Sequence, residues 1–100
     1  MDFCVIKEID GKTLTARING ALNTSTSPVF LKELEPELEN IDRLILDFKD
    51  KPHTTSAGLR VLLLLMQKME NRGTMKLINV NDDVLELLDN IGFLSMLTVE

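Results

Sequence analysis

The chain has 100 residues, of which 44% are hydrophobic and 27% are charged, a composition typical of a folded globular domain rather than of a disordered segment. Its formal net charge is −5 and no cluster of Lys and Arg stands out, which argues against a surface that binds nucleic acid. No apolar run approaches the roughly 18 residues of a membrane span, the N-terminus lacks a signal-peptide pattern, and the single Cys4 permits no internal disulfide. We therefore expect one domain over residues 1–100, cytoplasmic, with neither nucleic acid nor a membrane as partner.

A β-hairpin is predicted at the start of the chain. Phe3 to Ile9 is apolar and β-branched, and Asp10-Gly11 after it is a strong turn signal. Thr13 to Asn19 alternates apolar and polar residues, as in a strand with one buried face. Cys4, in the first of these strands, is expected to be a small apolar residue in or near the core.

A first helix is predicted after the turn-rich connector 20–26. Ser27 is the expected N-cap and Pro28 the first helical residue, where a missing N–H costs nothing. Pro36 should kink or interrupt this helix, because an interior proline loses a backbone hydrogen bond and clashes with the preceding turn. Four acidic residues are interpreted as a solvated helix face, with a partner-facing acidic ridge as the alternative: Glu33, Glu35, Glu37 and Glu39.

The centre of the chain predicts a strand, a polar loop and a long helix. Leu44 to Phe48 is a continuous apolar run, typical of a strand buried on both faces. From Ala57 to about Arg72, apolar residues recur at helical spacing, and Gly73 marks the stop. This helix has more leucines than one buried stripe needs. We expect burial between the sheet and neighbouring helices, with an exposed interface as the alternative.

The last part of the chain predicts a fourth strand, a third helix and a short tail. Met75 to Val80 is the strand, and Asn81 or Asp82 caps a helix that Gly92 closes. The tail, residues 93–100, is apolar enough for a last short strand or turn. The order β-β-α-β-α-β-α indicates an α/β fold.

His53 and Ser56 are the residues that would carry any chemistry. His53 is the only histidine, and the Cys/His spacing of a zinc site is absent from the sequence. A nucleophile pair of Ser56 with His53 would also need an orienting acid and oxyanion donors, which the sequence does not supply in a recognisable pattern. The sequence contains no Gly-rich nucleotide-binding loop. We therefore expect no catalysis, no metal and no cofactor, with His53 facing solvent.

Ser56, at the expected start of the second helix, allows two interpretations. As an N-cap, its hydroxyl oxygen would accept a hydrogen bond from an N–H of the first turn. Alternatively, the unpaired N–H groups and partial positive charge of a helix N-terminus favour a phosphoryl group there. Such a group adds about −1.5 to −2 charges at neutral pH and would disrupt binding if the surface is an interface.

Four motifs, in this order, resemble those of a STAS domain of the anti-anti-sigma-factor type. Ile18-Asn19-Gly20-Ala21-Leu22-Asn23 resembles the turn after the family's second strand, and Leu44-Ile45-Leu46-Asp47-Phe48 resembles its central strand. Thr55-Ser56-Ala57-Gly58-Leu59-Arg60-Val61-Leu62 resembles the motif that opens its second helix. Val84-Leu85-Glu86-Leu87-Leu88, followed by Ile91-Gly92-Phe93, resembles its closing helix.

The resemblance implies a STAS-like α/β fold, with a small mixed β-sheet of four to five strands packed by about three to four helices. It also implies an anti-sigma factor antagonist that is not an enzyme. In such proteins the serine that matches Ser56 is phosphorylated by an anti-sigma factor serine kinase and dephosphorylated by a phosphatase. The unphosphorylated form binds the kinase, which then releases its sigma factor.

The partner surface implied by the resemblance is the loop and helix start of residues 51–60, with the turn at residues 20–24 beside it. Its candidate residues are Asn23, Thr24, His53, Thr54, Thr55, Ser56, Ala57, Gly58 and Arg60. Arg60, one turn into the helix, is a candidate contact for the partner or for a phosphate on Ser56. We expect a monomer or a weak dimer.

One alternative keeps the fold but not the switch. The chain would then be a STAS scaffold subunit, never phosphorylated, of a lipid-transport or stress-signalling complex. Thr55, which stands where the family often has Asp, and the polar loop before it favour this alternative. In that case Ser56 is a helix cap and nothing more.

Overall fold

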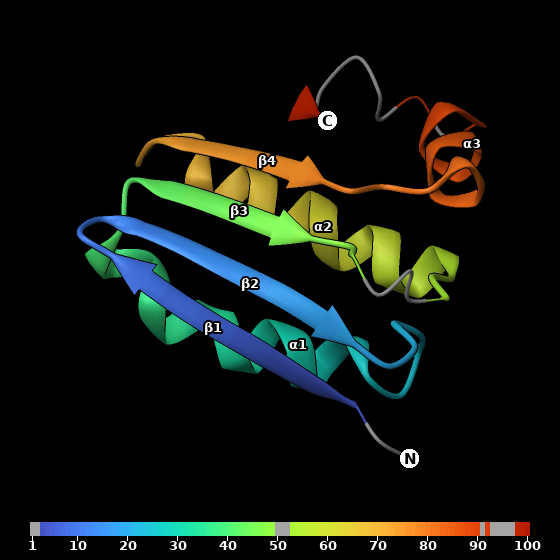
Figure 1. Cartoon of the computed structure of the whole chain (residues 1–100), viewed down its shortest axis with the longest axis horizontal. Coiled ribbons are helices and arrows are strands. Elements are labelled where there is room, and N and C mark those ends of the chain that lie inside the picture. Colours follow the sequence, from blue (N-terminus) through green and yellow to red (C-terminus); the bar gives the residue numbers. More distant parts are fainter. Residues whose placement is uncertain (1–2, 50–52, 91, 93–97) are drawn as a thin grey trace.

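The computed structural model describes residues 3–49, 53–90, 92 and 98–100, and its strands form one sheet (Figure 1). The sheet has five strands in the order β1-β2-β3-β4-β5. Their bounds are β1 (Cys4–Asp10), β2 (Thr13–Asn19), β3 (Arg43–Asp47), β4 (Thr74–Ile78) and β5 (Thr98–Val99). β1 and β2 are antiparallel, and the other neighbouring strands are parallel. The small mixed sheet expected from the resemblance is confirmed.

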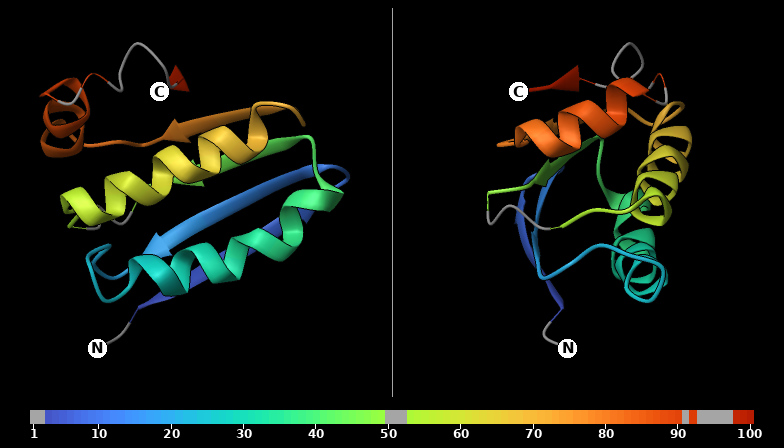
Figure 2. Two further views of the ribbon diagram at one scale, coloured as in Figure 1. Left: turned by 180° about the vertical axis from the view of Figure 1, so that it is seen from behind. Right: turned by 90° about the vertical axis from the view of Figure 1, so that its right-hand side faces the viewer.

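Helices connect the parallel strands. Their bounds are α1 (Ser27–Leu34), the 3-10 helix η1 (Glu35–Asn40), α2 (Ser56–Met69) and α3 (Asp82–Asn90). α1 and α2 lie side by side against one face of the sheet, and α3 lies beyond the end of β4 (Figure 2). The α-helix stops before Pro36 and continues as η1, which confirms the predicted interruption. None of the described helices is long and apolar enough to cross a membrane.

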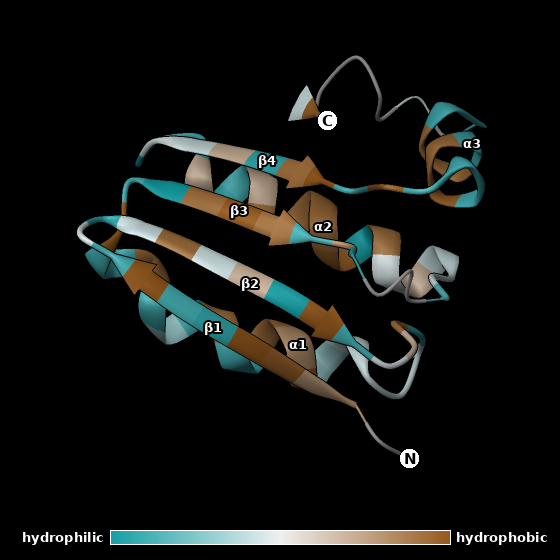
Figure 3. Cartoon of the chain, in the orientation of Figure 1, coloured by the Kyte–Doolittle hydropathy of each residue, from teal (hydrophilic) through white to brown (hydrophobic). Residues whose placement is uncertain are grey.

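Alternation along the strands decides which residues enter the core. Leu14, Ala16 and Ile18 of β2 point to the helices and have no exposed surface, as the period of two predicts. Hydrophobic residues also recur along β3 and α2, which face each other across the core (Figure 3). The largest fully buried side chains are Phe30, Phe48, Leu14, Ile18, Leu22, Leu34, Leu44, Leu46, Leu59, Leu62, Leu65 and Met69.

Two predictions fail at the face of the sheet that points away from the helices. Leu44 and Leu46 are fully buried, but Ile45 points to the opposite face and is only half-buried, so β3 is not buried on both faces. No helix within the described residues lies on that side of the sheet. The prediction that Cys4 is in or near the core is also wrong. Cys4 is exposed, because it pairs with Asn19 on this face of the edge strand β1.

The leucine-rich helix α2 is largely buried, which confirms the favoured interpretation. Leu59, Leu62 and Leu65 pack into the core, whereas the side chain of Leu64 is 38% exposed. The helix ends at Met69, earlier than predicted. There the bonding tightens, because the N–H groups of Glu70 and Arg72 donate to carbonyls three residues earlier instead of four, at 3.4 Å to Gln67 and 2.9 Å to Met69.

Two helix caps lie one residue before the predicted positions. Thr26 and not Ser27 precedes α1, and Thr55 and not Ser56 precedes α2. Neither threonine caps its helix through a side-chain hydrogen bond. The predicted cap of α3 is confirmed, since Asn81 Oδ1 accepts a hydrogen bond from the Val84 N–H at 2.9 Å.

The glutamates of α1 and η1 form a solvated face with surface ion pairs. Lys7 lies 3.2 Å from the carboxylate of Glu33, and Lys68 lies 3.1 Å from that of Glu35. All four side chains remain partly exposed, so each pair contributes at most about 1 kcal/mol to the free energy of unfolding.

Candidate functional site

Two loops are joined by backbone hydrogen bonds at the carboxyl end of the parallel strands. The Leu22 N–H donates to the His53 carbonyl at 2.8 Å, and the Thr55 N–H donates to the Leu22 carbonyl at 3.0 Å. These bonds form an isolated parallel bridge between Leu22 and Thr54. Both bridged residues are buried, with exposed fractions of 0% for Leu22 and 5% for Thr54. Residues 53–55, directly before α2, are therefore docked on the turn that follows β2.

Gly58 brings the start of α2 close to this bridge. A Cβ atom at Gly58 would lie 2.8 Å from Leu22 Cγ and 2.9 Å from the Leu22 carbonyl oxygen, inside van der Waals contact. Only glycine leaves room for the turn at this distance. Gly58 thus allows the start of α2 to pack directly against Leu22 of the connector.

The side chain of Asn23 holds the neighbouring turn in shape. Its Oδ1 accepts hydrogen bonds from the N–H groups of Ser25 at 2.9 Å and Thr26 at 3.1 Å. Thr26 Oγ1 in turn donates to the Ala21 carbonyl at 2.6 Å and accepts from the Asn23 N–H at 2.9 Å. These bonds account for Asn23 as a turn-forming residue and leave Thr24 exposed at the tip.

Ser56 is the first residue of α2 and is exposed. Because Thr55 occupies the N-cap, the interpretation of Ser56 as the cap is wrong. Its hydroxyl is not the acceptor that closes the helix end. No acidic residue lies in the first turn of α2, so no carboxylate of that turn opposes a negative group that meets the partial positive charge of this helix end. Arg60, also exposed, follows one turn later on the same side of the helix.

The structure separates the candidate partner-binding residues into three groups. The side chains of Thr24, His53, Ser56 and Arg60 are exposed, those of Asn23, Thr55 and Ala57 are half-buried, and Thr54 and Gly58 are buried. The exposure of His53 confirms its predicted solvent-facing position. Thr54 and Gly58 can serve a partner only by positioning the surface, because neither presents a side chain to solvent.

The arrangement offers a modifiable hydroxyl but no catalytic machinery within the described residues. Ser56 lies at a helix end that favours an added negative group. Among residues 3–49, 53–90, 92 and 98–100, no group of three or more His, Cys, Asp or Glu could hold a metal ion.

A cavity beside His53 was missed by sequence reasoning. It has a volume of about 360 Å³ and lies between the segment before α2 and helix α3. Its lining residues are His53, Thr54, Asn81, Asp83, Val84, Glu86, Leu87 and Asn90. No sequence pattern indicated it, because residues 53–54 and 81–90 are far apart in the chain and come together only in the folded protein.

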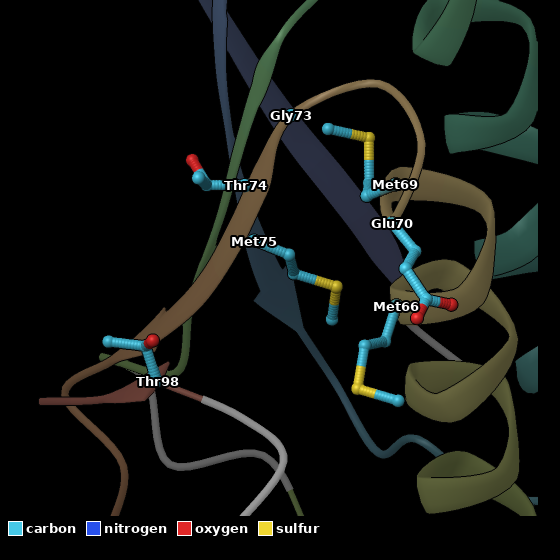
Figure 4. A pocket seen from close by; sticks show the side chains of 7 residues that line it. All are labelled: Met66, Met69, Glu70, Gly73, Thr74, Met75 and Thr98. Carbon is cyan, nitrogen blue, oxygen red and sulfur yellow. The ribbon is translucent and has the colours of Figure 1, made fainter.

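A second cavity, of about 370 Å³, lies at the opposite end of α2 (Figure 4). Three methionines line much of it, and its full lining is Met66, Met69, Glu70, Gly73, Thr74, Met75 and Thr98. Because Met69 ends α2 and Ser56 starts it, this cavity is remote from the Ser56 surface (Figure 1).

The sequence profile of the STAS domain matches residues 5–100. The chain belongs to the STAS domain family. Within it, this STAS domain is 31% identical over 94 residues to the candidate anti-sigma factor antagonist BtrV of Bordetella bronchiseptica. The match covers 92% of this chain and 80% of BtrV. These matches place the chain in the anti-sigma factor antagonist group.

Solved structures agree with this STAS fold. A candidate anti-sigma factor antagonist from Thermotoga maritima superposes with a TM-score of 0.88 at 18% identity, over 95% of this chain and 84% of that one. The unphosphorylated form of the anti-sigma factor antagonist SpoIIAA superposes with a TM-score of 0.80 at 16% identity, over 99% and 88%. The phosphorylated form of the Bacillus protein SpoIIAA gives a TM-score of 0.74 at 15% identity, over 99% and 91%. At these identities the likeness concerns the fold alone.

Membership of this family distinguishes between the two classes of function considered from the sequence, a regulatory binding protein and an enzyme. Anti-sigma factor antagonists are regulators and not enzymes, so the expectation of a non-enzymatic protein agrees with the family. A catalytic role for Ser56 or His53 has no support.

Proposed function

We propose that this STAS domain binds an anti-sigma factor kinase while Ser56 is unmodified and loses that partner when the kinase phosphorylates Ser56. A phosphatase would restore the binding form. The domain acts in the cytoplasm as a monomer or weak dimer, and the kinase supplies all of the chemistry.

One observation carries this proposal. Ser56 is exposed at the first position of α2, and its hydroxyl is not the helix cap. A serine hydroxyl in this place can be modified without removing a structural hydrogen bond of the cap. The first-turn N–H groups and the helix dipole then favour the phosphoryl group in the folded protein.

The surface around Ser56 is held in place before any modification. The Leu22–Thr54 bridge ties the segment before α2 to the connector after β2, and Gly58 allows the helix to sit against both. We infer that phosphorylation acts by changing the charge of a surface that is already formed. Two negative charges in the middle of a protein interface cost binding energy through desolvation and repulsion of neighbouring acidic groups.

Intact-mass measurement and phosphopeptide mapping of the protein from its native cells test the modification. We expect one added phosphate on Ser56, absent from Ser56→Ala. If the protein carries no phosphate during both growth and stress, the scaffold alternative replaces the switch.

Binding of the anti-sigma factor kinase tests the consequence. Ser56→Ala should bind at least as well as the wild type, and Ser56→Glu should bind much more weakly. Thr74→Glu is the matched control, because it adds the same charge at an exposed position at the other end of the sheet. Equal binding by all three variants would rule out Ser56 as the switch.

A further inference from the structure

The cavity beside His53 combines an acidic rim with an apolar floor. Asp83 and Glu86 of α3 and His53, directly before α2, are exposed lining residues, and Val84 and Leu87 contribute the apolar lining. Val84 is 2% exposed and packs into the core, so the floor is fixed by the fold. α3 has no basic residue in its last turn, and the sequence of the helix, DDVLELLDN, contains no Lys or Arg at all.

The carboxylates and the apolar lining of the cavity determine which kind of chemical group can bind in it. The carboxylates repel a phosphate or another anion. Among the described residues no group of three or more metal-ligating side chains is found, so a metal ion lacks the ligands it needs. A long cationic side chain satisfies both parts of the cavity, because its methylene stem covers apolar surface while its charged head meets the carboxylates.

The cavity is continuous with the surface proposed for the partner. Thr54 lines the cavity and also forms the bridge with Leu22, and Ser56 follows two positions later. A protein that covers Ser56 therefore lies beside the cavity. At about 360 Å³ the cavity is near the lower end of the roughly 300–1,000 Å³ range of small-ligand pockets, which suits one inserted side chain.

We propose that the cavity formed by His53, Asp83, Val84, Glu86 and Leu87 receives an arginine or lysine side chain of the protein that binds the Ser56 surface. This inference rests on the function proposed above and adds the chemistry of the partner. The basic side chain anchors the partner on α3, at one side of the residue whose phosphorylation ends the complex.

Two double variants test the anchor. Their binding is measured to the same kinase whose binding is weakened by Ser56→Glu. Asp83→Asn with Glu86→Gln removes both carboxylates of the cavity. Asp82→Asn with Asp89→Asn removes two exposed carboxylates of the same helix that do not line it. We expect the first pair to weaken binding about tenfold or more and to reduce its salt dependence, because charge-assisted hydrogen bonds are lost. The second pair should change binding less than threefold.

The outcomes separate this inference from the function on which it rests. If Ser56→Glu abolishes binding while the two double variants behave alike, the switch stands and the anchor is wrong. If the wild type self-associates through the cavity and the Asp83→Asn/Glu86→Gln variant does not, a second copy is the occupant and the anchor is also wrong. Circular dichroism on both double variants checks that each remains folded.

A defined small probe tests the cavity without any partner. Nα-acetyl-arginine amide, titrated into ¹⁵N-labelled protein, should shift the amide signals of His53, Glu86 and Asn90, and the Asp83→Asn/Glu86→Gln variant should lose these shifts. The neutral analogue Nα-acetyl-citrulline amide serves as the control for shape without charge. Equal shifts with both compounds, or none at these residues with the arginine compound, would overturn the assignment.

Discussion

Gly58→Ala tests whether the close approach of α2 to the Leu22 turn shapes the site. In an exposed helix this change is stabilising by about 1 kcal/mol, because alanine loses less backbone entropy on folding than glycine. At Gly58 the new Cβ would lie 2.8 Å from Leu22 Cγ and 2.9 Å from the Leu22 carbonyl oxygen. The backbone of Leu22 cannot easily move away, because its N–H and carbonyl are both hydrogen-bonded to the segment before α2.

The steric cost should exceed the gain in helix propensity. Overpacking costs about 1–3 kcal/mol, and displacement of the turn weakens two backbone hydrogen bonds worth about 0.5–1.5 kcal/mol each. After the gain of about 1 kcal/mol is subtracted from the overpacking cost and the loss of both hydrogen bonds, we expect the free energy of unfolding to fall by about 1–5 kcal/mol. For a domain of this size each kcal/mol lowers Tm by about 4–8 °C.

Urea denaturation followed by far-UV circular dichroism measures this change, since the chain has no Trp or Tyr to serve as a fluorescent reporter. Gln67, exposed on the same helix, supplies the control. The difference between Gln67→Ala and Gln67→Gly gives the propensity contribution in α2 without a steric contact. If Gly58→Ala is as stable as the wild type or more stable, the close packing on Leu22 does not constrain the site.

Three further predictions follow from local geometry. Ser56→Asp should raise the free energy of unfolding by about 0.3–1 kcal/mol, an effect that salt reduces, because α2 has no acidic residue in its first turn; a lower stability in urea would contradict this. Asn79 has a φ of +58° and donates to Asp47 Oδ1 at 2.8 Å, so Asn79→Ala should be less stable than Asn79→Gly by about 1 kcal/mol in the same assay; the reverse order would count against strain at this turn. Cys4 should react fully with a thiol reagent in native buffer, as an exposed residue does, and protection until urea is added would place it in the core after all.

The local periodicity of the sequence was enough to order the elements. The alternation of Leu14, Ala16 and Ile18 predicts a half-buried strand, and helical spacing predicts α2, because side-chain direction repeats every two residues in a strand and every 3.6 in a helix. The turn at Gly11 and the break at Pro36 followed from backbone restrictions of those residues.

Positions that depend on distant neighbours were not predictable in this way. Cys4 was expected in the core, but its burial depends on which face of an edge strand the helices cover. Thr54 appeared to belong to a polar surface loop, and its burial results from a bridge to Leu22 that lies 32 positions earlier.

The sequence by itself therefore determined the order of strands and helices, the family motifs and the place of Ser56 at the start of α2. Only the tertiary structure decided that Thr55 and not Ser56 precedes the helix as its cap, that Gly58 seats α2 on Leu22, and that His53 shares a cavity with α3. The reason is physical. Periodicity and turn preferences act between residues close in the chain, whereas caps, close approaches and cavities depend on segments brought together by folding.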